Sequence, residues 1–140
     1  MEPLVRAIVT VMPAAQVVVI DDNSPDGTAN KVAELQDSVP QLNLLLRTTN
    51  RGFAPSYLDG FRWARLHTFD VVVTMDADYS HDPKYLPAIV GALENSDVAV
   101  GSRYAMGGGV QNWPWHRQAF SRGANLIAQR LTGVPARDVT

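Results

Sequence analysis

The chain has 140 residues, 46% of them hydrophobic, which suits a single globular domain with a core of ordinary size. It contains no cysteine, and this excludes a disulfide framework, a thiolate zinc site and a cysteine nucleophile. Its formal net charge is −2, but residues 1–98 hold 7 Lys/Arg and 13 Asp/Glu, whereas residues 99–140 hold five arginines and one aspartate. The asymmetry is consistent with a cation site in the first part and an anion site in the second, or with solvated charge alone.

The hydrophobic pattern alternates between helical and strand periodicity along the chain. The predicted order is a helix over 1–12, a strand over 16–20, a helix over 29–36, a strand over 42–46, a helix over 55–66, a strand over 71–75, a helix beginning at Asp82 and Pro83, a strand over 96–100 and a helix ending near Leu131. Alternating helices and strands favour an α/β sandwich with a mainly parallel sheet.

Polar side chains directly follow three of the predicted strands. Asp21 and Asp22 end the first strand, Asp76 and Asp78 end the third, and Arg103 follows the last. Ligands of parallel α/β sheets bind beyond the carboxyl ends of the strands. We therefore expect these three strand ends to share one edge and to form a composite active site.

The two acidic pairs have different alternatives. Because side chains alternate along a strand, Asp76 and Asp78 would point to the same side. Two such carboxylates repel each other unless they are protonated, solvated or bridged by a cation, and oxygen ligands suit Mg²⁺ or Mn²⁺. The pattern thus predicts a metal site, with a purely structural loop as the alternative. For Asp21 and Asp22 the alternative is capping of the loop over 23–28.

The basic part of the chain offers donors for a phosphate. Arg117 and Ser121 are four residues apart on the predicted last helix, so they share one face and both donate to phosphate oxygens. A solvated helix face is the alternative. Trp113 and Trp115 fit either core packing or contact with a lipid chain.

Five segments together resemble the polyprenyl/dolichyl-phosphate mannose synthases, within the family 2 glycosyltransferases. They follow the family's order: VVVIDDNSPDGTA, GFAPSYLDGFRWA, VVVTMDADYSHDPKYLP, VGSRYAMGGGVQNWPWHRQAFSRGANL and GVPARDVT. The resemblance implies a GT-A fold, which is a Rossmann-like three-layer sandwich with a mostly parallel sheet. Residues 1–140 would form a single domain of that family.

The resemblance also implies an activity. It is transfer of mannose from GDP-mannose to dolichyl or polyprenyl phosphate, with inversion at the sugar carbon and with Mg²⁺ or Mn²⁺ as cofactor. The implied location is peripheral, at the cytoplasmic face of a membrane, and no nucleic-acid partner is expected.

Seven residues match positions that the family uses. By this resemblance Asp21, Asp22 and Asp76 hold the nucleotide sugar. Asp76 and Asp78 hold the metal ion, and together with Arg117 they are the expected catalytic residues. The implied ligands of the acceptor or donor phosphate are Arg103, Arg117 and Ser121.

The chain departs from the family pattern at both ends. Family members normally begin with another strand, which lies in the middle of the sheet, and continue beyond the position of Thr140. We therefore expect a domain truncated at both ends, an incomplete sheet and weak or no activity for residues 1–140 alone. The alternatives are an inactive truncated homologue, or a phosphatase of the haloacid dehalogenase type with Asp76 as nucleophile, although Ser80 stands where that type wants Thr or Val.

Overall fold

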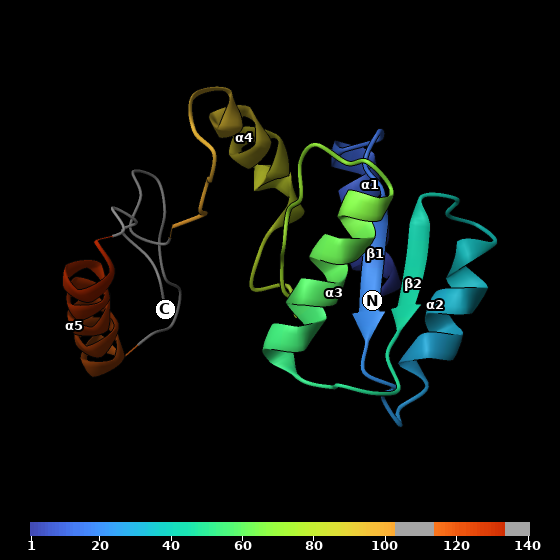
Figure 1. Cartoon of the computed structure of the whole chain (residues 1–140), viewed down its shortest axis with the longest axis horizontal. Coiled ribbons are helices and arrows are strands. Elements are labelled where there is room, and N and C mark those ends of the chain that lie inside the picture. Colours follow the sequence, from blue (N-terminus) through green and yellow to red (C-terminus); the bar gives the residue numbers. More distant parts are fainter. Residues whose placement is uncertain (103–113, 134–140) are drawn as a thin grey trace. The chain divides into compact units, whose positions relative to one another are not determined.

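The computed structural model describes residues 1–102 and 114–133, so Arg103 and Trp113 lie outside the described residues. Two compact units, residues 1–90 and 91–140, are each described by themselves. The elements in chain order are α1 Glu2–Val11, β1 Val17–Asp21, α2 Thr28–Gln36, β2 Leu42–Leu46, α3 Phe53–Leu66, the 3-10 helix η1 Pro83–Tyr85, α4 Leu86–Gly91, the 3-10 helix η2 Ala92–Asn95 and α5 Trp115–Thr132 (Figure 1). Within the described residues, no helix is both long and apolar enough to cross a membrane.

The first unit is built around a parallel pair of strands. β1 pairs with β2 in a register that places Val17 opposite Leu42 and Asp21 opposite Leu46. Side chains alternate between the two faces of a sheet, so every second residue of each strand points to the same helices. The two carboxyl ends therefore lie at one edge, as predicted from the sequence.

One face of the strand pair carries the core. Its buried side chains come from α1, α2, the connection after α2 and β2, with partly buried residues of α1, β1 and β2 packed against them. The buried members are Val5, Val32, Leu35, Val39 and Leu42. Burial of such side chains contributes about 1.5–3 kcal/mol each.

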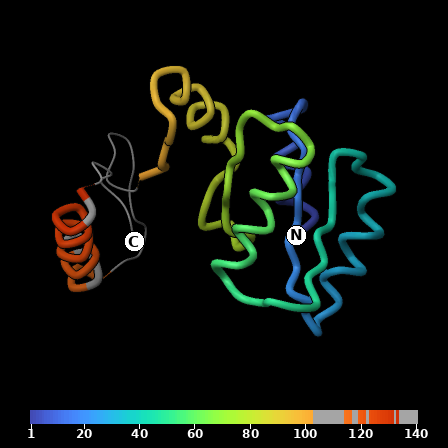
Figure 2. Tube along the Cα trace, viewed as in Figure 1, coloured from blue at the N-terminus to red at the C-terminus, as the bar shows by residue number. Residues whose placement is uncertain are grey.

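The other face of β1 is covered by α3, which gives the unit three layers. Figures 1 and 2 show α3 to the left of β1 and partly overlapping it, whereas α2 lies to the right, beside β2. Gly60 permits this close approach, because a Cβ on it would come within 2.7 Å of the Cδ1 atom of Ile20. A helix–strand–helix sandwich agrees with the predicted α/β class.

Local sequence signals set the ends of the helices. Asp82 caps η1 by accepting a hydrogen bond from the Lys84 backbone N–H at 3.0 Å, and Pro83 occupies the first position. Gly133 ends α5 in a left-handed conformation with φ 68°. The sequence predicted the helix start at Asp82 and Pro83 and an end of the last helix near Leu131.

Two predicted strands are absent from the structure. Residues 71–75 and 96–100 carry no strand assignment, and Val71, Val72 and Val73 are 41–45% exposed. A strand needs a hydrogen-bonded neighbour, and β-forming side chains alone do not supply one. In the described residues β1 pairs along one edge only, so residues 71–75 have no strand beside them. The expectation of an incomplete sheet is thus confirmed, while the two strand predictions are wrong.

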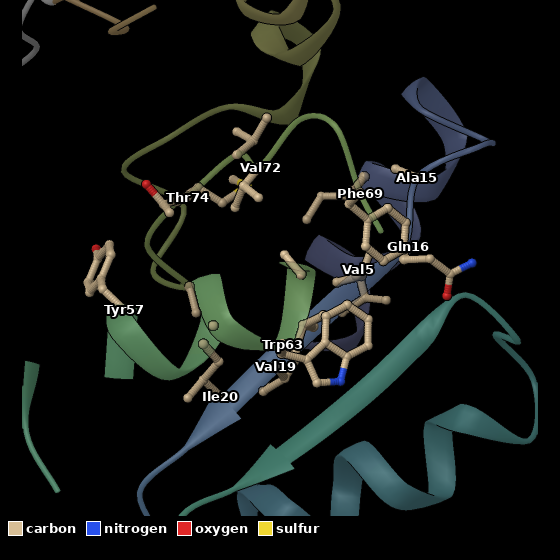
Figure 3. A pocket seen from close by; sticks show the side chains of 18 of the residues that line it. Val5, Ala15, Gln16, Val19, Ile20, Tyr57, Trp63, Phe69, Val72 and Thr74 are labelled. Carbon is tan, nitrogen blue, oxygen red and sulfur yellow. The ribbon is translucent and has the colours of Figure 1, made fainter. Parts of the chain in front are cut away.

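A large cavity lies along the unpaired side of β1. Its volume is about 820 Å³, and its walls come from α1, β1, α3 and residues 69–77. Figure 3 shows Ile20 of β1, Trp63 of α3 and Val72 around it. Most of the lining side chains are apolar.

Candidate functional site

Asp21 acts within its own loop. Its side chain accepts hydrogen bonds from the Ser24 backbone N–H, at 3.2 Å to Oδ2, and from the Ser24 hydroxyl, at 2.6 Å to Oδ1. The residue is only 4% exposed. Aspartate commonly stabilises turns in this manner. The loop-capping alternative therefore describes what the Asp21 carboxylate does in this structure.

Asp22 is held from two directions and is more accessible. Its Oδ1 accepts a hydrogen bond from Arg47, and its Oδ2 accepts one from the Gly52 backbone N–H at 2.6 Å. Gly52 is the N-cap of α3, where the helix dipole favours a negative charge. The side chain of Asp22 remains 31% exposed, so this predicted ligand of the nucleotide sugar is accessible from solvent.

Arg47 stands at the centre of this arrangement. It directly follows β2, its side chain is 4% exposed, and its Nε donates to Oδ2 of Asp59 at 2.8 Å. The hydrogen bond to Asp59, together with that to Asp22, raises the pKa of Arg47 above its ordinary value. Hydrogen bonds from Arg47 and then Arg62 lower the pKa of Asp59. The group is a charged network fixed to three segments of the chain.

The Asp76–Asp78 segment forms a turn rather than a strand end. The Asp76 backbone N–H donates to Nδ1 of His81 at 3.1 Å, and the Ser80 backbone N–H donates to Oδ1 of Asp78 at 2.8 Å. Tyr79, between them, adopts the left-handed conformation with φ 64°. Hydrogen bonding to Ser80 lowers the pKa of Asp78, so this carboxylate is an anion at neutral pH.

The structure brings two of the predicted acidic positions to one cavity. Asp21 and Asp76 both line the cavity beside β1. The third predicted strand end is not confirmed, because residues 96–100 form no strand and Arg103 lies outside the described residues. The predicted composite edge is therefore reduced to a cavity lined by Asp21 and Asp76, and of these two only Asp21 lies at the end of a strand.

The donor set of Asp76 and Asp78 fits a hard cation only in part. Both side chains offer carboxylate oxygens, which Mg²⁺ and Mn²⁺ prefer. Among the described residues there is no group of three or more His, Asp or Glu side chains that could hold a metal ion. Mg²⁺ is commonly held by one or two carboxylates plus substrate phosphates and water. The chemistry of these two carboxylates is compatible with such a shared site, in which a phosphate ligand would supply the remaining oxygens.

Two of the three predicted phosphate ligands, Arg117 and Ser121, lie on α5. Ser121 is buried, at 8% exposure. Arg117 is one helical turn before it, and the side chain of Arg117 lies outside the description. Their common helix is confirmed, while their role stays a prediction.

Sequence reasoning missed three residues that shape the site. They are Arg47, Asp59 and His81. Arg47 contacts Asp22 directly, and Asp59 is linked to Asp22 through Arg47. His81 accepts a hydrogen bond from the Asp76 backbone N–H. A signal existed for Arg47, since it directly follows a predicted strand at the same edge as Asp21 and Asp22. No signal pointed to Asp59 or His81, because their partners depend on how helices and turns meet in space.

Comparison with known proteins gives one family match over almost the whole chain. The sequence profile described as glycosyl transferase family 2 matches residues 3–139. The chain is 41% identical over 130 residues to a polyprenol monophosphomannose synthase of Mycolicibacterium smegmatis, covering 91% of this chain and 49% of that protein. It is 38% identical over 129 residues to an undecaprenyl-phosphate mannosyltransferase of Micrococcus luteus, covering 92% of this chain and 53% of that protein.

An archaeal protein is similar to the same degree. The chain is 41% identical over 125 residues to a dolichol-phosphate mannosyltransferase of Pyrococcus furiosus, covering 89% of this chain and 34% of that protein. The chain thus spans about half the length, or less, of these relatives.

Proposed function

The chain belongs to glycosyl transferase family 2. We propose that it takes part in the transfer of mannose from GDP-mannose to a polyprenyl or dolichyl phosphate. The observation that carries the proposal is the identity of 38–41% to three proteins named for this kind of transfer, over about nine tenths of the chain. The same family match favours a glycosyltransferase over the phosphatase alternative.

Asp76 and Asp78 are the proposed ligands of the donor diphosphate, through a shared divalent cation. The Asp78 carboxylate is anionic at neutral pH, which suits this role. A bound Mg²⁺ or Mn²⁺ would neutralise the negative charge that develops on the leaving group. The proposed nucleotide contact falls to Asp22, whose side chain is partly exposed, while Asp21 fixes the loop that carries it.

The acceptor phosphate needs no protein base. A phosphate monoester has a second pKa of about 6 and is mostly a dianion at pH 7. One of its oxygens attacks the anomeric carbon, the bond from that carbon to the diphosphate oxygen breaks, and GDP leaves with the electron pair, so the configuration inverts. Arg103, Arg117 and Ser121 are the proposed ligands that orient the acceptor phosphate.

The lipid acceptor implies work at a membrane surface. We assign the protein to a peripheral position at the cytoplasmic face of a membrane, and Trp115 and Phe120 of α5, each 81% exposed, support contact with lipid.

Mannosyl transfer from labelled GDP-mannose to a polyprenyl phosphate tests the proposal. The assay uses the chain extended at both ends with the flanking segments of the Mycolicibacterium relative. Asp76→Ala and Asp78→Ala are each expected to lower the rate by about 100-fold or more, as loss of one electrostatic stabiliser commonly does. Asp37→Ala, an exposed aspartate at the end of α2, is the matched control and should keep the wild-type rate.

His81→Ala separates a proton-transfer role from a structural one. Its imidazole accepts a hydrogen bond from the Asp76 backbone N–H. The phosphate substrate carries no proton that the imidazole would have to remove, so substantial activity should remain. A loss as large as that of Asp78→Ala would contradict the mechanism without a base.

A further inference from the structure

One buried guanidinium joins three segments of the first unit. Arg47 donates from Nε to Asp59 of α3, from Nη1 to Asp22 after β1, and from Nη2 to the carbonyl oxygen of Asn50. Its own backbone N–H also donates to the carbonyl oxygen of Asp21 at 2.8 Å. Every branch of this side chain is therefore engaged at the carboxyl ends of β1 and β2.

The Asp22 carboxylate is fixed by this contact together with a second one. One oxygen accepts from Arg47 and the other from the Gly52 backbone N–H. Gly52 has φ 123°, a conformation that side-chain-bearing residues rarely adopt, and Asn50 has φ 50°. The loop over 47–52 thus has an uncommon backbone conformation, and two of its residues donate hydrogen bonds to the Asp22 carboxylate.

The chemistry of arginine suits this position. A buried charge requires partners, and the planar fork of arginine presents several donors in fixed directions. A lysine has three donors on one nitrogen at the end of a flexible stem, so it cannot reach the same three acceptors together. Arg62 offers a contrast, because it contacts the same Asp59 at 2.8 Å but its side chain is 66% exposed.

We infer that Arg47 is a positioning residue, which holds Asp22 and the loop over 47–52 in the arrangement that receives the nucleotide part of the donor. The identity of the ligand rests on the proposed function. The fixing of Asp22 rests on the contacts alone. Without Arg47, Asp22 would keep only its hydrogen bond from the Gly52 backbone N–H. Its carboxylate would be less well fixed and the affinity for the donor would fall, although Arg47 itself does not touch the nucleotide.

The test compares Arg47→Lys, Arg47→Met and the control Arg62→Gln. Two quantities are measured in the extended chain: the Kd for GDP-mannose with Mn²⁺, by calorimetry, and hydrogen exchange at the Gly52 amide. Both Arg47 variants are expected to weaken binding by about 10-fold or more, the size of effect seen when a supporting partner of a binding residue is lost. They should also speed exchange at Gly52, and Arg62→Gln should change neither quantity.

The outcomes separate this inference from the proposed function. If the wild-type chain fails to bind GDP-mannose, the proposed function fails, and the Gly52 amide alone decides whether Arg47 fixes the loop. A folded Arg47→Lys protein with wild-type Kd overturns the positioning role, whatever the amide does. If Arg47→Met does not fold, Arg47→Lys and Asp59→Asn provide the same comparison.

Discussion

Asp21, the last residue of β1, and Asp22, which follows it, differ in their surroundings, and this difference decides which of them can reach a ligand. Asp21 is buried, and its carboxylate accepts hydrogen bonds from Ser24. The Asp22 side chain is about one third exposed, and a hydrogen bond from Arg47 fixes its direction. A mutation of either residue should weaken a nucleotide site, but for different reasons: Asp21 shapes the loop, and Asp22 makes the contact.

The Arg47 network predicts a specific response to acid. The pKa of Asp59 is lowered in the folded chain, chiefly by the Arg47 hydrogen bond. A depressed folded-state pKa gives stability that is complete above the ordinary value of 3.8 and is lost as the pH falls through the lowered value. Asp59→Asn should therefore flatten the fall of stability in this acidic range.

Denaturant midpoints measured as a function of pH check this expectation. The control is Asp37→Asn, an exposed aspartate outside the network, which should follow the wild-type curve. Equal acid slopes for wild type and Asp59→Asn would contradict a stabilising role of the ionised carboxylate.

The acidic positions could be predicted from the sequence, but the partners that orient them could not. Strand periodicity placed Asp21 and Asp22 at a strand end. Their separate roles depend on Arg47, which lies 25 residues after Asp22, and on Asp59 within a helix. Contacts over such separations arise from packing, which a local pattern does not encode.

At the level of elements, β2 shows that burial varies along one face of a strand, because alternation places Leu42 and Leu46 on the same side. Leu42 is 2% exposed within the core, whereas Leu46, at the other end of the strand, is 45% exposed. Both are leucines in the same strand, so their contributions to stability differ only through their environment.

Leu42→Ala should lower the free energy of unfolding by about 2–5 kcal/mol, because it leaves a cavity among α1, α2 and the strands. Leu46→Ala, the matched control, should change it by no more than about 0.5 kcal/mol. Urea unfolding followed by circular dichroism measures both. Similar effects for the two variants would show that β2 does not pack as described.

The helices and the first two strands were well predicted, while the strands over 71–75 and 96–100 were not. Helices satisfy their backbone hydrogen bonds within the segment, so periodicity and caps such as Asp82 suffice to predict them. A strand depends on a neighbour elsewhere in the chain. The run from Val71 to Val73 has strand-forming side chains but no paired neighbour in the described structure.

For the molecule as a whole, family membership and an incomplete sheet occur together. The match to glycosyl transferase family 2 covers residues 3–139, yet the chain spans only about half of the two bacterial relatives and a third of the archaeal one. The cavity of about 820 Å³ lies against the unpaired edge of β1, between two acidic positions of the proposed donor site and the apolar side chains of α1 and α3. We therefore expect residues 1–140 by themselves to bind the donor weakly.

Calorimetric titration of GDP-mannose tests the central claim most directly. It is carried out with and without Mn²⁺, on residues 1–140 and on the chain extended at both ends. The account predicts binding that requires the metal ion and that is strong only in the extended chain. An extended chain that is folded but does not bind GDP-mannose in the presence of Mn²⁺ would contradict it.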